Sequence, residues 1–80
     1  MYTVYILKSA VDDKFYIGQT SDINDRLRRH NSGYELSTKN GVPWQIIHSE
    51  EFTTRAESIR RELQIKSYKG GAAFKKLLNL

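Results

Sequence analysis

The sequence contains no cysteine, which removes two kinds of support that small domains often use. Without cysteine the chain has no disulfide, no cysteine-ligated structural zinc and no iron–sulfur cluster. Its two histidines alone make a poor zinc site. A chain of 80 residues buries only about 60–65% of its unfolded surface, so its stability margin is small. We expect one small domain, residues 1–80, whose fold depends on packing.

The sequence also lacks a long hydrophobic run. No apolar segment approaches the ~20 residues that are needed to span a bilayer. Residues 1–10 are apolar but have no basic residues ahead of the apolar stretch, so we interpret them as a strand and not as a signal peptide. These absences predict a soluble, cytoplasmic protein that does not act at a membrane.

Positive charge is concentrated in the last third of the chain. Residues 55–80 carry seven Lys and Arg against two Glu, whereas residues 1–54 carry six Lys and Arg against seven Asp and Glu. A basic face of this kind suits a polyanion such as nucleic acid. The alternative is an ordinary solvated helix surface.

Residue patterns predict three strands and three helices in the order ββαβαα. Residues 2–8 are largely apolar on both alternating faces, which predicts a strand covered on both sides, and residues 15–20 form the return strand of a hairpin. A third strand is predicted over residues 44–52, after a polar loop over residues 34–43. The pattern favours an α+β fold, with a small antiparallel sheet of three strands flanked by helices.

Side-chain caps mark where the predicted helices begin. Ser21 or Asp22 caps the first helix, and Thr54 and Glu57 form a capping box for the second. The predicted helices cover about residues 22–31, 55–69 and 72–80.

Two polar residues lie beside the apolar stripe of the first helix. At about 100° per residue, Ile23 and Leu27 define that stripe, and Arg26 and His30 fall next to it. A helix with only two apolar anchors gains little from an inward Arg and His unless the sheet side binds something through them. The alternative is that Arg26 reaches solvent or a local carboxylate, while His30 helps to end the helix.

The second helix carries a carboxylate at the margin of its predicted apolar stripe. Ala56, Ile59 and Leu63 form the stripe, and Glu62 lies about 60° from Ile59. A carboxylate there can bind a divalent cation or act in acid–base chemistry. The alternative is a surface ion pair with Lys66, worth roughly a few tenths of a kcal/mol.

The predicted hairpin supplies two tyrosines. If its turn is centred between Ala10 and Val11, Tyr5 lies opposite Tyr16 on one face of the sheet, although ordinary core packing also explains a tyrosine pair. Gly18 removes a side chain next to Tyr16, on the opposite face, and a glycine inside a strand lets another group approach the backbone. Together, two Tyr, one Arg, one His and one Glu suit metal-assisted phosphodiester hydrolysis.

Motifs in this order along the chain resemble the GIY-YIG nuclease domain. The resemblance covers about residues 2–68, is strongest over residues 15–33, and over residues 49–70 is similar to the small stand-alone branch of putative endonucleases. The residues that carry it are Thr3, Val4 and Tyr5, then Tyr16, Ile17 and Gly18, then Arg26, His30 and Glu62. Thr3 stands where the family's first Gly would be, and Val4 replaces Ile.

The resemblance implies a role for each site residue. Tyr5 would be the general base that activates water, and Tyr16 would orient water or substrate. Arg26 would stabilise the pentavalent phosphate, and His30 would assist the tyrosines or contact phosphate. Glu62 would ligate a single Mg²⁺ or Mn²⁺. Because the reference pKa of tyrosine is about 10, a base at Tyr5 needs a nearby cation that favours the phenolate.

We expect a metal-dependent endonuclease that acts on branched, flapped or damaged DNA, as in DNA repair, with a second copy or a protein partner supplying specificity. Sequence-independent phosphate contacts are predicted for Arg29, Arg55, Arg61, Lys66 and Lys69. One alternative is a module that binds nucleic acid or a partner with little or no cleavage. Another is a structural or toxin-like domain whose polar residues are merely tolerated. The choice between DNA and RNA, and any role of Asn79, stay open.

Overall fold

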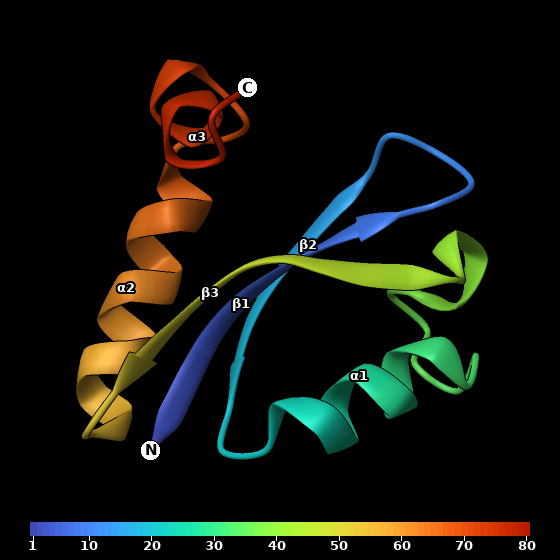
Figure 1. The fold of residues 1–80 in the computed structure, drawn as a ribbon, viewed down its shortest axis with the longest axis horizontal. Helices are drawn as coiled ribbons and strands as arrows, with labels where there is room; N and C mark the ends of the chain where they lie inside the picture. The colour runs from blue at the N-terminus through green and yellow to red at the C-terminus, as the bar shows by residue number, and fades with distance from the viewer.

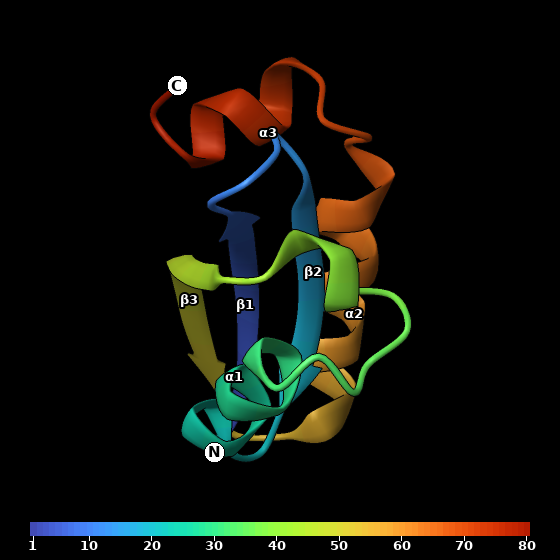
Figure 2. The ribbon, with the colours of Figure 1, turned by 90° about the vertical axis from the view of Figure 1, so that its right-hand side faces the viewer.

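The computed structural model describes residues 1–80 and has the predicted α+β architecture (Figure 1). One antiparallel sheet, in the order β2-β1-β3, is formed by β1 (Tyr2–Ser9), β2 (Phe15–Thr20) and β3 (Trp44–Phe52). The helices are α1 (Ile23–Asn31), α2 (Arg55–Ser67) and α3 (Ala72–Leu77), and a short 3-10 helix, η1, covers Lys39–Gly41. Figure 2 shows α1 on one face of the sheet and α2 on the other.

The central strand β1 is buried on both faces, as its two apolar faces predict. Toward α2 and α3, the buried cluster consists of Val4, Ile6, Ile65 and Phe74. Toward α1, the buried cluster consists of Tyr5, Leu7 and Trp44, with Ile23 and Leu27 packed against it. Each buried side chain of this size contributes about 1.5–3 kcal/mol to folding, so β1 holds both layers of the molecule together.

The register of the hairpin differs from the predicted one. Tyr5 pairs with Gly18, and Tyr16 pairs with Leu7, so Tyr5 and Tyr16 are not directly opposite each other. The Ser9 hydroxyl accepts hydrogen bonds from two turn N–H groups and holds a longer turn than expected. Because the shift is two residues, both tyrosines still share a face. Gly18 lies on this same face, so its predicted position on the opposite face is wrong.

The helix caps agree with the sequence signals. The Asp22 carboxylate accepts from the Asp25 N–H at the start of α1, and Thr54 and Glu57 form the complete capping box of α2. Two helices are shorter than predicted. After α2, Lys69 and Gly70 take up positive φ angles of 50° and 72°, which end the helix.

The predicted apolar stripe of α2 is wrong. Ile59 is 40% exposed, Leu63 is 60% exposed, and Ala56 is also exposed. The buried positions of this helix are Ser58 and Ile65. A helix that alternates charged and apolar residues around its whole circumference has no dominant apolar face, so periodicity alone does not fix which side meets the sheet.

Polar contacts explain the rotation of α2. Ser58 is small enough to lie against β2, where its hydroxyl is 3.3 Å from Gln19 Oε1. Arg61 donates to both carboxylate oxygens of Glu50 on β3, at 2.9 and 3.0 Å. His48 Nε2 is 2.7 Å from the same carboxylate. These contacts turn Arg61 toward the sheet and the predicted stripe toward solvent. None of the helices has the length and apolar character that a membrane span requires.

Candidate active site

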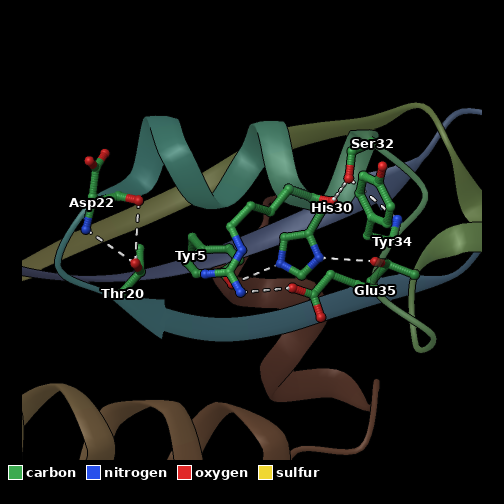
Figure 3. Close-up of polar contacts among 9 residues, drawn as sticks. Tyr5, Thr20, Asp22, His30, Ser32, Tyr34 and Glu35 are labelled. Carbon is green, nitrogen blue, oxygen red and sulfur yellow. Dashed lines mark hydrogen bonds and ion pairs between the residues drawn. The ribbon is translucent and has the colours of Figure 1, made fainter.

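A buried tyrosine–histidine pair lies between the sheet and α1. Tyr5 Oη and His30 Nε2 are 3.0 Å apart, and the two residues are 0% and 2% exposed. Figure 3 shows the two side chains facing each other, with Tyr5 rising from β1 and His30 hanging from the last turn of α1. The predicted inward position of His30 beside the core stripe is therefore what the structure has.

Tyr16 on β2 completes an aromatic cluster around this pair. The Tyr16 ring centroid lies 4.6 Å from that of His30 and 6.2 Å from that of Tyr5. Tyr16 is only partly buried, whereas Tyr5 is fully buried. Of the two tyrosines, Tyr16 is therefore the one that reaches solvent.

Gly18 creates the space that the Tyr5 side chain occupies. A Cβ atom at Gly18 would lie 2.6 Å from Tyr5 Oη, 2.8 Å from Tyr5 Cζ and 3.1 Å from Tyr16 Cε1. These distances are shorter than van der Waals contact, so only glycine lets the phenol ring cross β2 here. Because β2 is an edge strand, the Tyr5 hydroxyl is brought toward the edge of the sheet.

Arg26 contributes an unsatisfied donor to the same face. It lies one turn before His30 on α1 and is partly buried. Its Nε atom is buried and has no hydrogen-bond partner. A buried donor without a partner costs about 1–3 kcal/mol, and more when it is charged, so an anion that accepts from it would bind favourably.

Burial sets the ionisation of the buried pair. Burial, followed by the nearby Tyr16 hydroxyl, raises the pKa of Tyr5 to about 12. The Arg26 side chain acts in the opposite direction, through its charge and a hydrogen bond, and the Glu62 charge adds to the rise. Burial also lowers the pKa of His30; Glu35 opposes this shift, and Arg26 and Arg29 add to it. At neutral pH the free protein therefore holds a phenol beside a neutral imidazole.

Glu62 comes from the other layer of the molecule. It lies on α2, its side chain is 18% exposed, and its Oε2 is 2.5 Å from Lys66 Nζ. Its charge adds to the rise in the pKa of Tyr5, but Glu62 lies on α2, on the face of the sheet opposite α1 (Figure 2). The structure contains no cluster of three or more His, Asp or Glu that could enclose a metal. One carboxylate fits Mg²⁺ that keeps most of its water and is shared with a phosphate, and does not fit a closed protein cage.

The predicted phosphate-binding residues fall into two groups. Four of them lie at the surface: Arg29, Arg55, Lys66 and Lys69. Arg29 is 3.4 Å from Glu35, the Arg55 guanidinium lies 5.2 Å from the centroid of the Tyr2 ring, and Lys66 is paired with Glu62. Arg61 differs, because both arms of its guanidinium are engaged and its side chain is 22% exposed. Arg61 therefore serves the packing of α2 in this structure.

The remaining motif positions are structural. Val4 and Ile17 pack in the core on the α2 face, and Thr3 pairs with Thr20 in the hairpin. Thr3 thus fits a regular strand position where the family pattern has glycine. Asn79 is exposed beyond the end of α3 and has a positive φ of 58°.

Sequence reasoning missed three residues on the far side of His30, of which Thr38 contacts the imidazole directly. Thr38 Oγ1 is 3.0 Å from His30 Nδ1, and the Trp44 indole N–H donates to the Thr38 carbonyl at 2.7 Å. The Asn31 side-chain amide accepts from the Trp44 N–H at 2.6 Å and donates to the Trp44 carbonyl at 3.1 Å. Thr38 stands in a polar loop with several other hydroxyls, so composition gives no signal that distinguishes it.

The chain is similar to known proteins over most of its length. Residues 1–75 match the model of the GIY-YIG catalytic domain. A UPF0213 protein of Haloquadratum walsbyi is 41% identical over 66 residues, covering 81% of this chain and 73% of the relative. A UPF0213 protein of Staphylococcus epidermidis is 38% identical, covering 81% and 79%.

A solved structure shares the fold. The solution NMR structure of a UPF0213 protein from Bacillus halodurans is 29% identical, with a TM-score of 0.50, and the match covers 91% of this chain and 90% of that one. The family model, the relatives and the shared fold together show that the chain belongs to the GIY-YIG family of nuclease domains.

Proposed function

We propose that this protein is a metal-dependent endonuclease that hydrolyses phosphodiester bonds in branched, flapped or damaged DNA. The observation that carries the proposal is the buried Tyr5–His30 pair beside the unpartnered Nε of Arg26. A core that only needed stability would gain more from apolar side chains at these positions than from a buried arginine Nε–H without a partner.

Arg26 is the group that meets the scissile phosphate in this proposal. Its buried Nε–H donates to a phosphate oxygen, and its charge offsets the extra negative charge that develops in the pentavalent transition state. Free of substrate, the same donor has no partner. The cost of that unsatisfied donor is relieved when phosphate binds, so the site favours its anionic substrate.

Tyr5 and His30 move the proton. Tyr5 takes a proton from the attacking water as its own hydroxyl proton passes to His30 Nε2, which lies 3.0 Å away. The raised pKa of Tyr5 makes a free phenolate rare at neutral pH. Arg26 favours the phenolate, and Tyr16, which reaches solvent, orients the water. Since Tyr5 is fully buried in the free chain, substrate binding must shift the groups that cover it.

Glu62 would hold the divalent cation, Mg²⁺ or Mn²⁺. When bound, the cation supplies charge neutralisation at the phosphate and at the leaving oxygen. In the free protein, Lys66 forms an ion pair with the Glu62 carboxylate. This ion pair would have to break for Glu62 to bind the cation. Lys66 is then free to join Arg29, Arg55 and Lys69 as a phosphate contact.

Substrate choice rests on shape in this proposal. No helix of the fold has the features of a base-reading DNA motif, so phosphate geometry and distorted backbone decide binding. A second copy of the chain or a protein partner would supply further specificity and bring a second site to the other strand.

The test is a cleavage screen on wild type beside Glu62→Gln. Branched, flapped, nicked and single-stranded DNA and RNA are incubated with Mg²⁺, Mn²⁺ or EDTA, and binding is measured separately by fluorescence anisotropy. Glu62→Gln should lower kcat by about 10²-fold or more while the Kd changes little. Glu51→Gln, at an exposed carboxylate of β3, is the matched control and should retain activity. Cleavage that continues in EDTA would contradict the proposal.

A second candidate is a nucleic-acid-binding module without cleavage. Two observations favour it: Tyr5 is fully buried, and the Glu62 carboxylate is already paired with Lys66. This candidate predicts salt-dependent binding in the same screen, with no cut product under any metal, and with equal behaviour of wild type and Glu62→Gln.

A further inference from the structure

The loop between α1 and β3 brings a threonine hydroxyl to the far side of His30. Thr38 Oγ1 lies 3.0 Å from His30 Nδ1, opposite the nitrogen that faces Tyr5. Thr38 is 1% exposed, His30 2% and Tyr5 0%, so solvent does not compete for either nitrogen of the imidazole. Tyr5, His30 and Thr38 therefore form one continuous buried chain of hydrogen bonds (Figure 3 labels the first two).

Thr38 is fixed from both neighbouring strands. The Trp44 indole N–H holds the Thr38 carbonyl at 2.7 Å. A Cβ atom at Gly41 would clash with the Trp44 indole ring, so the loop packs directly on that ring. The Ser9 hydroxyl donates to the Gly41 carbonyl at 2.6 Å. The hydroxyl of Thr38 is thus held where it is by β1 and β3, and does not depend on a loose loop.

The chemistry of imidazole gives this contact a consequence. A neutral histidine has one N–H donor and one acceptor nitrogen, and the partner of each nitrogen decides which is which. Both partners of His30 are hydroxyls, and a hydroxyl can donate or accept. The Tyr5 phenol is more acidic than the Thr38 alcohol and is therefore the better donor. This favours the arrangement in which the Nε2 lone pair faces the Tyr5 hydroxyl and Thr38 Oγ1 accepts the Nδ1–H. If His30 then gains the Tyr5 proton, the Nδ1–H still has its acceptor. As in a catalytic triad, a third group orients the histidine that accepts the proton; here the proton comes from Tyr5, and the orienting group is a hydroxyl in place of the usual carboxylate.

We propose that Thr38 is a positioning residue that holds His30 in the Nδ1–H tautomer, so that Nε2 is the acceptor for the Tyr5 proton. Thr38 acts through His30 and does not touch the substrate. The consequence for cleavage rests on the proposed function, whereas the tautomer of His30 in the free protein does not.

The first test reads the tautomer directly. Long-range ¹H–¹⁵N NMR spectra of ¹⁵N-histidine-labelled protein separate protonated from unprotonated ring nitrogens. The chain has only two histidines, so His48, which bonds to Glu50, is an internal reference. Wild type and Thr38→Ser should show Nδ1–H at His30, and Thr38→Val should lose that preference. An Nε2–H tautomer in wild type, or an unchanged Nδ1–H tautomer in Thr38→Val, would overturn the proposal.

The second test separates positioning from folding and from substrate binding. On the DNA cleaved best by wild type, Thr38→Val should lower kcat by at least about tenfold with an unchanged Kd, and Thr38→Ser should restore most of it. Thr53→Val, at an exposed threonine, is the matched control. Full kcat in Thr38→Val would overturn the catalytic part. If wild type cleaves nothing, the proposed function fails while the NMR result still decides the tautomer. If Thr38→Val does not fold, Thr38→Ala replaces it, and the wild-type spectrum alone can still overturn the proposal.

Discussion

At the scale of single residues, the site depends on the absence of a side chain at Gly18. The Tyr5 ring crosses the position that any Cβ at Gly18 would fill. Its hydroxyl is held there by His30, so the ring cannot swing away without losing a buried hydrogen bond. The sequence indicates a close approach at Gly18. It does not say that the approaching group is the chain's own tyrosine, because that follows from the hairpin register.

Gly18→Ala should therefore destabilise the fold. The added methyl lies 2.6 Å from Tyr5 Oη, and forcing a methyl into a packed site costs about 1–3 kcal/mol. Urea unfolding measures the loss. The double variant Gly18→Ala/Tyr5→Phe removes the closest atom, so its destabilisation should be smaller than the sum of the two single changes. Strict additivity would mean that the methyl and the hydroxyl do not meet.

Tyr5 should also make the protein sensitive to alkali. Its folded-state pKa is raised to about 12, above the unfolded value of about 10. The neutral form is favoured by folding, so this stabilisation is complete below pH 10 and is lost as the pH rises from 10 to 12. The loss should reach about 2–3 kcal/mol. Unfolding free energies across this range should fall less steeply in Tyr5→Phe, and the exposed Tyr34→Phe should behave as wild type does.

At the scale of elements, the ends of α2 follow from the local sequence, whereas the face that it turns toward the sheet follows from packing. The ends of the helix follow local signals, since the capping box of Thr54 and Glu57 needs only residues three apart. Its rotation follows distant contacts, above all the bidentate bond of Arg61 to Glu50 on β3. Burial raises the pKa of Glu50, but hydrogen bonds from Arg61 and His48 outweigh burial and lower it. That carboxylate is thus ionised and bonded, and it anchors the helix.

The rotation of α2 can be tested with two aliphatic residues two positions apart. Ile65 is fully buried against β1, whereas Leu63 is 60% exposed. Ile65→Ala should cost about 2–4 kcal/mol of unfolding free energy, and Leu63→Ala less than about 1 kcal/mol. Chemical denaturation of both variants measures the difference. A larger loss of unfolding free energy in Leu63→Ala than in Ile65→Ala would instead support the apolar stripe that periodicity predicts.

At the scale of the whole molecule, the candidate site draws on both layers around one sheet. Tyr5, Tyr16, Arg26 and His30 lie on the α1 face, and Glu62 comes from α2 on the other side. The α3 end of the molecule serves a different purpose. Phe74 is buried there and meets the Phe15 ring edge-on, with centroids 5.1 Å apart. The core cluster that contains Phe74 therefore lies on the face of the sheet opposite Tyr5, Tyr16, Arg26 and His30.

Phe74→Leu should lower stability without changing the site. The smaller side chain loses part of its contact with Phe15, which costs about 1–2 kcal/mol, and Tm should fall by roughly 5–15 °C for a domain of this size. Calorimetry measures the fall in Tm. At temperatures well below the lowered Tm, nucleic-acid affinity should stay within about twofold of wild type, because none of the polar residues has moved. A loss of affinity in the folded variant would mean that α3 takes part in binding.

The sequence by itself determined the element order, the caps and the candidate residues, because each depends on chemistry or spacing within a few positions of the chain. It indicated an inward Arg26 and His30 from helical spacing alone, and the structure has them there. The tertiary structure alone decided the pairing of Tyr5 with Gly18, the rotation of α2 and the link from Thr38 to His30. These features join segments distant in sequence, and several registers or rotations satisfy the same local pattern until packing selects one.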